Sequence, residues 1–140
     1  MRSETKRNSR RDVYCPPFRV RALPAMVAAA LHAPLALAAP PTTELPSGAS
    51  VKAGSATVTQ TGGAAPLMTI NQSTNKAVID WGTFNVGGAA TVRFKQPDAS
   101  SATLNRVNDP KPSQIFGRIE ANGKVFLVNP SGIYFAPGAT

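Results

Sequence analysis

The chain has almost no cysteine or histidine, with one residue of each among its 140. Cys15 and His32 both lie within the first 38 residues, so residues 39–140 contain neither. This excludes from residues 39–140 a disulfide framework of the kind that stabilises many small exported domains. It also excludes zinc sites built on cysteine and histidine, and a Ser-His-Asp site, which needs a histidine base.

Acidic residues are also scarce in residues 39–140. They are Glu44, Asp80, Asp98, Asp109 and Glu120. No two of them are near each other in the sequence, whereas glycosidases need two placed carboxylates and calcium sites need several acidic ligands. We therefore interpret them as solvated surface groups. We expect no catalytic site, no metal site and no cofactor, and we predict that the protein is not an enzyme.

The first 38 residues have the composition of a secretory signal. Residues 1–21 carry seven basic and two acidic residues, and residues 22–38 are uncharged and mostly apolar. Ala36 and Ala38 supply the small residues that signal peptidase reads, so we predict entry into the general secretion machinery and cleavage after Ala38. A transmembrane anchor, which needs about 20 apolar residues, a buried helix and a twin-arginine signal are the less favoured alternatives.

Removing this segment changes the electrostatic argument. The whole chain has a formal net charge of +8, which by itself suggests a nucleic-acid partner. Residues 39–140 hold eight basic and five acidic residues, a net charge of +3, with no basic cluster. Most of the basicity belongs to the signal segment, so we predict no nucleic-acid partner.

The remainder of the chain has a β pattern. Residues 39–50 are a lead-in rich in proline, serine and threonine that we expect to be extended or loose. Residues 51–140 show no helical periodicity. They contain β-forming runs of about five residues separated by glycine- and proline-containing corners. This pattern fits a β-sandwich, a barrel or a β-helix, and the residues alone leave the choice open.

Side-chain parity predicts which residues face the core. Ile79 and Trp81 share one face of a strand, whereas Phe84 and Val86 have the opposite parity, which predicts a bulge or corner at residues 82–83. The other residues predicted to face inward are Met68, Ile70, Ala77, Val92, Phe94, Ile115 and Ile119.

Three segments near the end of the chain carry specific predictions. Residues 124–128 are apolar on both faces, which predicts a strand buried between layers. Asn122 and Gly123 form a strong hairpin signal that favours an antiparallel pair, and a corner between two sheets is the alternative. Residues 129–132, Asn-Pro-Ser-Gly, predict a turn in which the Asn129 side chain accepts from a backbone N–H ahead of it.

The order of segments from Trp81 to Phe135 resembles the amino-terminal domain of two-partner secretion exoproteins, the filamentous haemagglutinin type also called the haemagglutination-activity domain. The matching segments are IDWGTFNVG (79–87), VRFKQP (92–97), LNRV (104–107), PSQIFGRIEANGKVFLVNPSGIYF (112–135) and the closing Gly138-Ala139. The Asn-Pro-Asn-Gly-Ile motif of that family is present as residues 129–133, with serine at its third position.

The resemblance implies an all-β fold over residues 51–140, a right-handed parallel β-helix with capping strands at its amino end. It implies the secretion-signal domain of an adhesin or haemagglutinin-like exoprotein, which also nucleates β-helix folding. The implied partner is a dedicated outer-membrane β-barrel transporter with periplasmic recognition domains. The protein would be exported through the periplasm to the cell surface or the medium. The candidate recognition residues are Asn129, Pro130, Ser131, Gly132 and Ile133, together with Asn105 and Arg106.

Two other functions remain open at this point. One is a fragment of an extracellular carbohydrate-active β-helix enzyme, whose carboxylates would lie downstream. The other is a stand-alone exported binding module, in which residues 39–140 would fold by themselves. We expect the chain to be a fragment, or a truncated reading frame, of a longer exoprotein, because a coil stack ending at Thr140 exposes unpaired strand edges.

Overall fold

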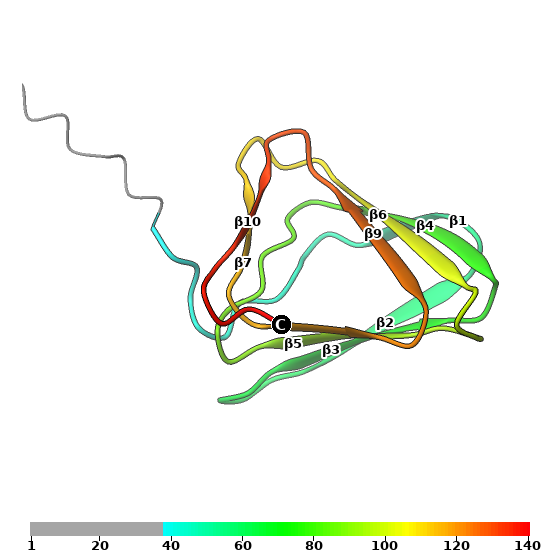
Figure 1. Cartoon of the computed structure of the whole chain (residues 1–140), viewed down its shortest axis with the longest axis horizontal. Coiled ribbons are helices and arrows are strands. Elements are labelled where there is room, and N and C mark those ends of the chain that lie inside the picture. Colours follow the sequence, from blue (N-terminus) through cyan, green and yellow to red (C-terminus); the bar gives the residue numbers. More distant parts are fainter. Residues whose placement is uncertain (1–37) are drawn as a thin grey trace, which may run out of the picture. The chain divides into compact units, whose positions relative to one another are not determined.

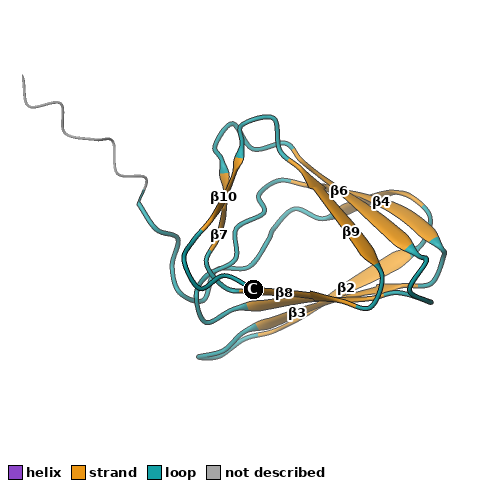
Figure 2. Cartoon of the chain, in the orientation of Figure 1, coloured by secondary structure: helices purple, strands orange, loops and turns teal. Residues whose placement is uncertain are grey.

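The computed structural model describes residues 38–140. The predicted signal segment, including Ala36, therefore lies outside the described residues, apart from Ala38, which is exposed. The described part consists of strands and loops without a helix (Figure 2). Within it, accordingly, no helix has the length and apolar character needed to cross a membrane.

In residues 38–140, ten strands form three sheets. They are β1 (Ser50–Ala53), β2 (Ala56–Thr61), β3 (Leu67–Gln72), β4 (Lys76–Trp81), β5 (Thr91–Lys95), β6 (Ala102–Val107), β7 (Ser113–Ile115), β8 (Arg118–Ala121), β9 (Lys124–Val128) and β10 (Ile133–Phe135). The first sheet has the order β2-β3-β5-β8, the second has the order β1-β4-β6-β9, and the third consists of β7 and β10. In Figure 1 the three sheets form the sides of a triangle around the core.

Successive passages of the chain stack in parallel, which makes this fold a β-helix. In the first sheet β3 pairs with β5 and β5 with β8, in the second β4 pairs with β6 and β6 with β9, and in the third β7 pairs with β10. β1 and β2 instead pair antiparallel with β4 and β3, and so cover the first coil. The predicted β-helix with amino-terminal capping strands is confirmed.

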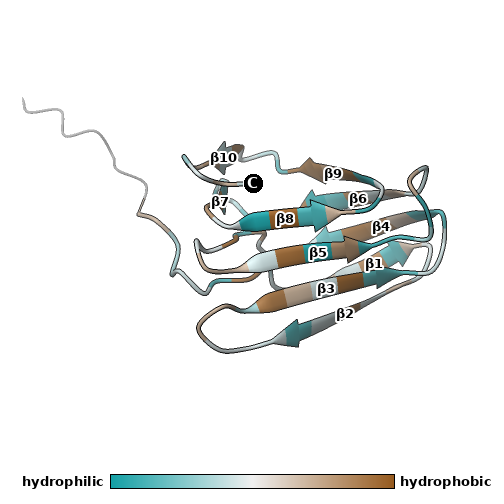
Figure 3. Ribbon diagram, turned by 60° about the horizontal axis from the view of Figure 1, so that its bottom comes forward, coloured by the Kyte–Doolittle hydropathy of each residue, from teal (hydrophilic) through white to brown (hydrophobic). Residues whose placement is uncertain are grey.

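The inward faces of the three sheets share one apolar core. Its fully buried members are Met68, Ile70, Ile79, Trp81, Phe84, Val86, Ala90, Val92, Phe94, Val107 and Ile115. Figure 3 shows β2, β3, β5 and β8 side by side, with hydrophobic and hydrophilic residues alternating along them. The rings of Trp81 and Phe84 meet edge to face, with centroids 5.3 Å apart. The chain therefore turns between these two residues, as parity predicted.

Polar side chains, of which Gln72, Gln96 and Thr103 are buried, hold the corner between the first and second sheets. The Gln96 Nε2 donates to Thr103 Oγ1 and to the Lys124 carbonyl, both at 3.0 Å. Thr103 also hydrogen-bonds the Gln72 side chain of the first coil. The Asn122 side chain accepts from the backbone N–H of Gln96 and donates to its carbonyl, each at 2.7 Å. These contacts connect three successive coils and fix the register in which they stack.

Two predictions for residues 122–128 are wrong. The Asn122-Gly123 pair does not form a hairpin, because β8 and β9 on either side of it belong to different sheets. The alternative, a corner between sheets, is what the structure has. The strand that follows is not buried between layers: Phe126 and Val128 are 53% and 50% exposed. β9 packs only its other face on the core, since the β-helix has one apolar interior.

The lead-in, residues 39–50, is not loose. The Gly87 N–H donates to the Glu44 carbonyl at 2.9 Å, and Ser47 forms an antiparallel bridge with Thr83. The segment finds backbone partners in the loop that follows β4, which the sequence pattern does not reveal.

Candidate functional site

The family-type motif at residues 129–133 forms the turn that joins β9 to β10. The Gly132 N–H donates to the Asn129 carbonyl at 3.0 Å and closes the turn. Gly132 has a φ of +102°, a region that glycine adopts more readily than other residues. Pro130 takes the second position, where its fixed φ suits a turn. The predicted turn is confirmed.

Asn129 ties this turn to the preceding coil. Its side chain is buried, and its Oδ1 accepts from the Ser131 N–H at 2.8 Å, as the sequence predicts. Its Nδ2 donates to the Lys111 carbonyl at 3.1 Å and to Ser113 Oγ at 2.9 Å. All three contacts are internal, so the amide is a structural clamp between the last turn and the segment that leads into β7.

Ser131 adds a second clamp at the position where the family motif has asparagine. Its Oγ donates to the Asp109 carbonyl at 2.8 Å. Ile133 opens β10 opposite Ser113 and packs partly against the core. Pro130 and Gly132 remain exposed. The structure therefore brings the five motif residues together in one turn, with its polar side chains directed into the protein.

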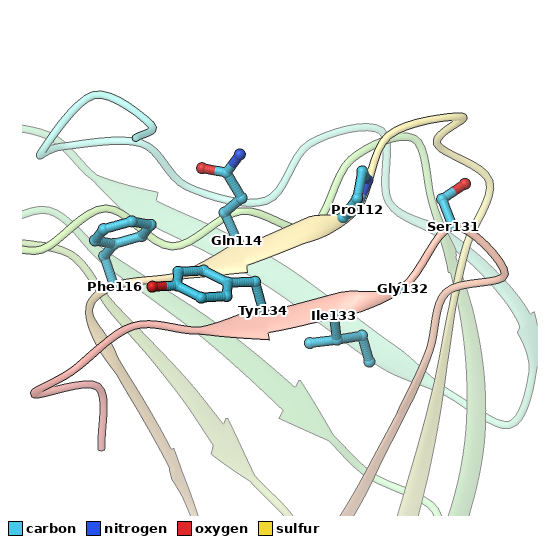
Figure 4. A pocket seen from close by; sticks show the side chains of 7 residues that line it. All are labelled: Pro112, Gln114, Phe116, Ser131, Gly132, Ile133 and Tyr134. Carbon is cyan, nitrogen blue, oxygen red and sulfur yellow. The ribbon is translucent and has the colours of Figure 1, made fainter. Parts of the chain in front are cut away.

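A groove of about 510 Å³ lies beside the turn, on the third sheet (Figure 4). It is lined by Pro112, Gln114, Phe116, Ser131, Gly132, Ile133 and Tyr134. The rings of Phe116 and Tyr134 lie with their centroids 5.9 Å apart, and Tyr134 is 47% exposed. Among the described residues, the buried Gln114 Oε1 accepts no hydrogen bond. The groove thus offers aromatic surface, and its unpaired acceptor is buried.

This groove was not predicted from the sequence. Gln114 and Phe116 have the parity opposite to the buried Ile115, and Tyr134 pairs in register with Gln114. The parity signal was present, but the pairing of β7 with β10 across 20 residues was not visible in the sequence. That pairing is what brings Phe116 and Tyr134 together.

Asn105 and Arg106, the two other candidate residues, lie away from the turn on β6. Asn105 is fully buried, accepts from Trp81 Nε1 at 2.9 Å and donates to the Phe126 carbonyl at 3.1 Å. It is therefore not available at the surface of the folded domain. Arg106 lies on the outer face of the second sheet and makes two hydrogen bonds to Asp80, at 2.7 and 3.0 Å.

The carboxylates of the described part accept hydrogen bonds within turns, in ion pairs or, for Glu44, from the Asn85 side chain. The Arg93 side chain hydrogen-bonds Glu120 at 2.7 Å and holds the pKa of that carboxyl below its usual value. Hydrogen bonds from the Ser100 side chain and backbone, with help from Ser101, likewise lower the pKa of Asp98. Within residues 38–140, no three His, Cys, Asp or Glu side chains are grouped so that they could hold a metal ion.

Comparison with known proteins now identifies the family. The family model of the TPS secretion domain, where TPS denotes two-partner secretion, matches residues 42–140. The chain belongs to this family. The crystal structure of the HMW1 secretion domain from Haemophilus influenzae is similar, with a TM-score of 0.61 and 37% identity, over 67% of this chain and 24% of that chain.

Two curated relatives support the same assignment. Both are heme/hemopexin-binding proteins from Haemophilus influenzae, 47% identical over 96 residues and 43% identical over 86 residues. The matches cover 69% and 61% of this chain, which spans only about a tenth of either relative (10% and 9%). The TPS domain is thus the secretion-signal domain of a two-partner secreted protein. The alternatives of an enzyme fragment and a stand-alone module are not favoured.

Proposed function

We propose that this TPS domain directs its exoprotein to a dedicated outer-membrane transporter, which recognises it in the periplasm and passes it to the cell surface or the medium. The turn at residues 129–133 and the adjoining groove on the third sheet would form the recognition site. The observation that carries this proposal is that the polar side chains of the turn bond within the domain, whereas the neighbouring aromatic surface is exposed. Asn129 and Ser131 are used internally, while Tyr134 and the groove beside them are left for a partner.

The chemistry of the groove indicates what would bind there. Phe116 and Tyr134 offer aromatic surface, which contributes strongly to binding when it is desolvated. The Oε1 of Gln114 is already buried without a hydrogen bond, so a partner would meet the exposed aromatic surface and not this acceptor. A transporter segment that presents an apolar side chain would therefore fit the groove.

We also propose that the domain starts the folding of the exoprotein after export. Residues 39–140 have no cysteine, so no disulfide within them would prevent the domain, once recognised, from unfolding for passage. Each coil pairs with the one before it, and the capping strands β1 and β2 close the first coil. A stack of this kind can grow coil by coil, since each new strand docks on an existing edge.

We propose no heme site in the TPS domain, although the two curated relatives are named for binding heme or hemopexin. Residues 39–140 contain neither histidine nor cysteine, two of the common axial ligands of heme iron. The role proposed for this domain is secretion, and any ligand binding by the full exoprotein would use other parts of it.

The test is secretion of the full chain from a bacterial host that also expresses the dedicated transporter. Asn129→Ala removes three hydrogen bonds and Gly132→Val forces a branched side chain onto a φ of +102°. We expect each to lower the secreted amount about tenfold or more. Gly88→Ala is the matched control, because a Cβ there meets no atom within 4 Å and its φ is not positive.

Tyr134→Ser separates recognition from folding, because the Tyr134 side chain is exposed and makes no hydrogen bond within the described residues. We expect secretion to fall while the thermal melt of the purified protein stays unchanged. If Asn129→Ala and Tyr134→Ser were both secreted in the same amount as the wild type, neither the turn nor the groove would be the recognition site.

A further inference from the structure

The outer face of the second sheet carries an ordered pattern that the proposed function does not use. Val78 of β4, Leu104 of β6 and Phe126 of β9 pair in register, so their side chains form one apolar stripe across three strands. The stripe is flanked by the register sets Lys76-Ala102-Lys124 on one side and Asp80-Arg106-Val128 on the other. We call these nine positions the second-sheet face; Figure 1 shows its strands β4, β6 and β9 side by side.

The stripe belongs to the outside of the β-helix. The neighbours of Leu104 along β6, Thr103 and Asn105, are fully buried, so Leu104 itself points outward. Phe126 is 53% exposed, and its neighbours Val125 and Leu127 pack against the core. A further coil would pair with the edge of β9 and lie beside the stripe in the plane of the sheet, about 4.8 Å away. Continuation of the β-helix therefore extends this face and does not cover it.

The second-sheet face carries a net positive charge. Arg106 is paired with Asp80 at 2.7 Å, but Lys76 and Lys124 form no ion pair within the described residues. These two lysines lie two strands apart, so their backbones are separated by about 10 Å along one border of the stripe. An apolar stripe bordered by two free ammonium groups is complementary to an apolar ridge bordered by carboxylates.

We propose that the second-sheet face is a second docking surface for the transporter and binds a transporter segment whose apolar side chains are flanked by Asp or Glu. This inference rests on the proposed function and adds a contact on a different side of the triangle from the turn at residues 129–133. A second copy of this chain is a poorer occupant, because two net-positive faces repel each other. A membrane surface is also a poorer one, since Val78 and Leu104 are partly buried and do not protrude.

The experiment measures binding of the full chain to the purified transporter in detergent at about 0.05 M and about 0.5 M NaCl. Phe126→Thr shortens the most exposed member of the stripe and keeps a strand-forming residue. The double variant Lys76→Glu/Lys124→Glu reverses the charged border. We expect each to weaken binding about tenfold at low salt, and high salt to weaken the wild type more than the double variant.

Lys95→Glu is the matched control. Lys95 is an exposed residue of β5, so one lysine-to-glutamate reversal, half the charge change of the double variant, is made on the first sheet, outside the second-sheet face. We expect it to bind like the wild type. Thermal melts of all variants check that the substitutions leave the fold intact.

Three results would overturn the inference. One is wild-type affinity in both Phe126→Thr and the lysine double variant. Another is lysine-dependent binding to vesicles of phosphatidylethanolamine and phosphatidylglycerol without transporter, which would make the face a membrane surface. The third is an effect of Phe126→Thr on the melt of the full-length exoprotein alone, which would mean that the exoprotein covers the face itself.

The outcome also separates this inference from the proposed function. Suppose that Tyr134→Ser binds the transporter more weakly while all second-sheet variants bind it like the wild type. The groove would then remain the recognition site and the second surface would be rejected. Absence of binding by the wild-type chain would reject both.

Discussion

Replacement of Asn105 by alanine should lower the stability of the TPS domain by removing buried hydrogen bonds. The Asn105 side chain is fully buried and connects the first coil to the third, accepting from Trp81 Nε1 at 2.9 Å and donating to the Phe126 carbonyl at 3.1 Å. In Asn105→Ala both groups lose their partner. Trp81 is itself only 1% exposed, so water cannot replace the lost acceptor without entering the core.

The size of the effect follows from the burial of the two orphaned groups. A buried polar group left without a partner costs about 1–3 kcal/mol. The Trp81 N–H should bear most of this cost, because the Phe126 carbonyl lies on the outermost strand of its sheet and is nearer to water. With the cavity left by the amide, we expect a loss of about 2–4 kcal/mol from a total unfolding free energy of about 5–15 kcal/mol.

Urea unfolding followed by tryptophan fluorescence is the appropriate assay, because Trp81 is the only tryptophan of the chain and reports on the altered site. Asn71→Ala is the matched control: Asn71 lies on the outer face of β3, and its side chain makes no hydrogen bond within the described residues. We expect the control to change stability by less than about 0.5 kcal/mol. If Asn105→Ala cost no more than Asn71→Ala, the structural role assigned to Asn105 would be refuted.

Three further predictions concern the contacts between coils. Gln96→Leu removes the amide that joins the second coil to the third at the corner between the first and second sheets, so it should lower the unfolding free energy by about 1–3 kcal/mol; an unchanged urea midpoint would contradict this. The hydrogen bond from Arg93 lowers the pKa of Glu120 below 4.5, so this pair contributes stability above that pH and loses it as the pH falls through the folded-state pKa. Glu120→Gln should therefore show a smaller loss of stability on acidification below about pH 4.5, and superimposable acid-unfolding curves would count against it. Gly117→Ala would drive a Cβ into two backbone carbonyls of the preceding coil and should make the chain protease-sensitive, whereas Gly88→Ala should resist protease like the wild type.

Much of the candidate site could be predicted from local sequence. The residues at 129–132 specify a turn because proline and glycine restrict the backbone and the Asn129 side chain closes an Asx-turn. These effects act within four residues and need no information about the rest of the fold. The groove beside the turn could not be predicted, because Phe116 and Tyr134 meet only through the pairing of β7 with β10.

The same distinction holds for Asn105. The resemblance to the family made it a candidate contact residue for the transporter. In the structure it is an interior residue, because β6 lies between β4 and β9 and alternate side chains of β6 face the core. Parity along β6 was readable from the sequence, but which parity faces inward depends on where the strand sits in the stack.

The sequence by itself determined the all-β class, the inward parity of Ile79, Trp81 and Phe94, the turn at residues 129–132 and the family. Each of these depends on periodicity, on backbone restriction within a few residues, or on the order of motifs. Only the tertiary structure decided that Asn122-Gly123 is a corner and that Phe126 faces solvent. Strands of adjacent coils pair over 20 or more residues, as Lys76 does with Ala102, and this spacing varies from sheet to sheet, so no sequence period encodes it.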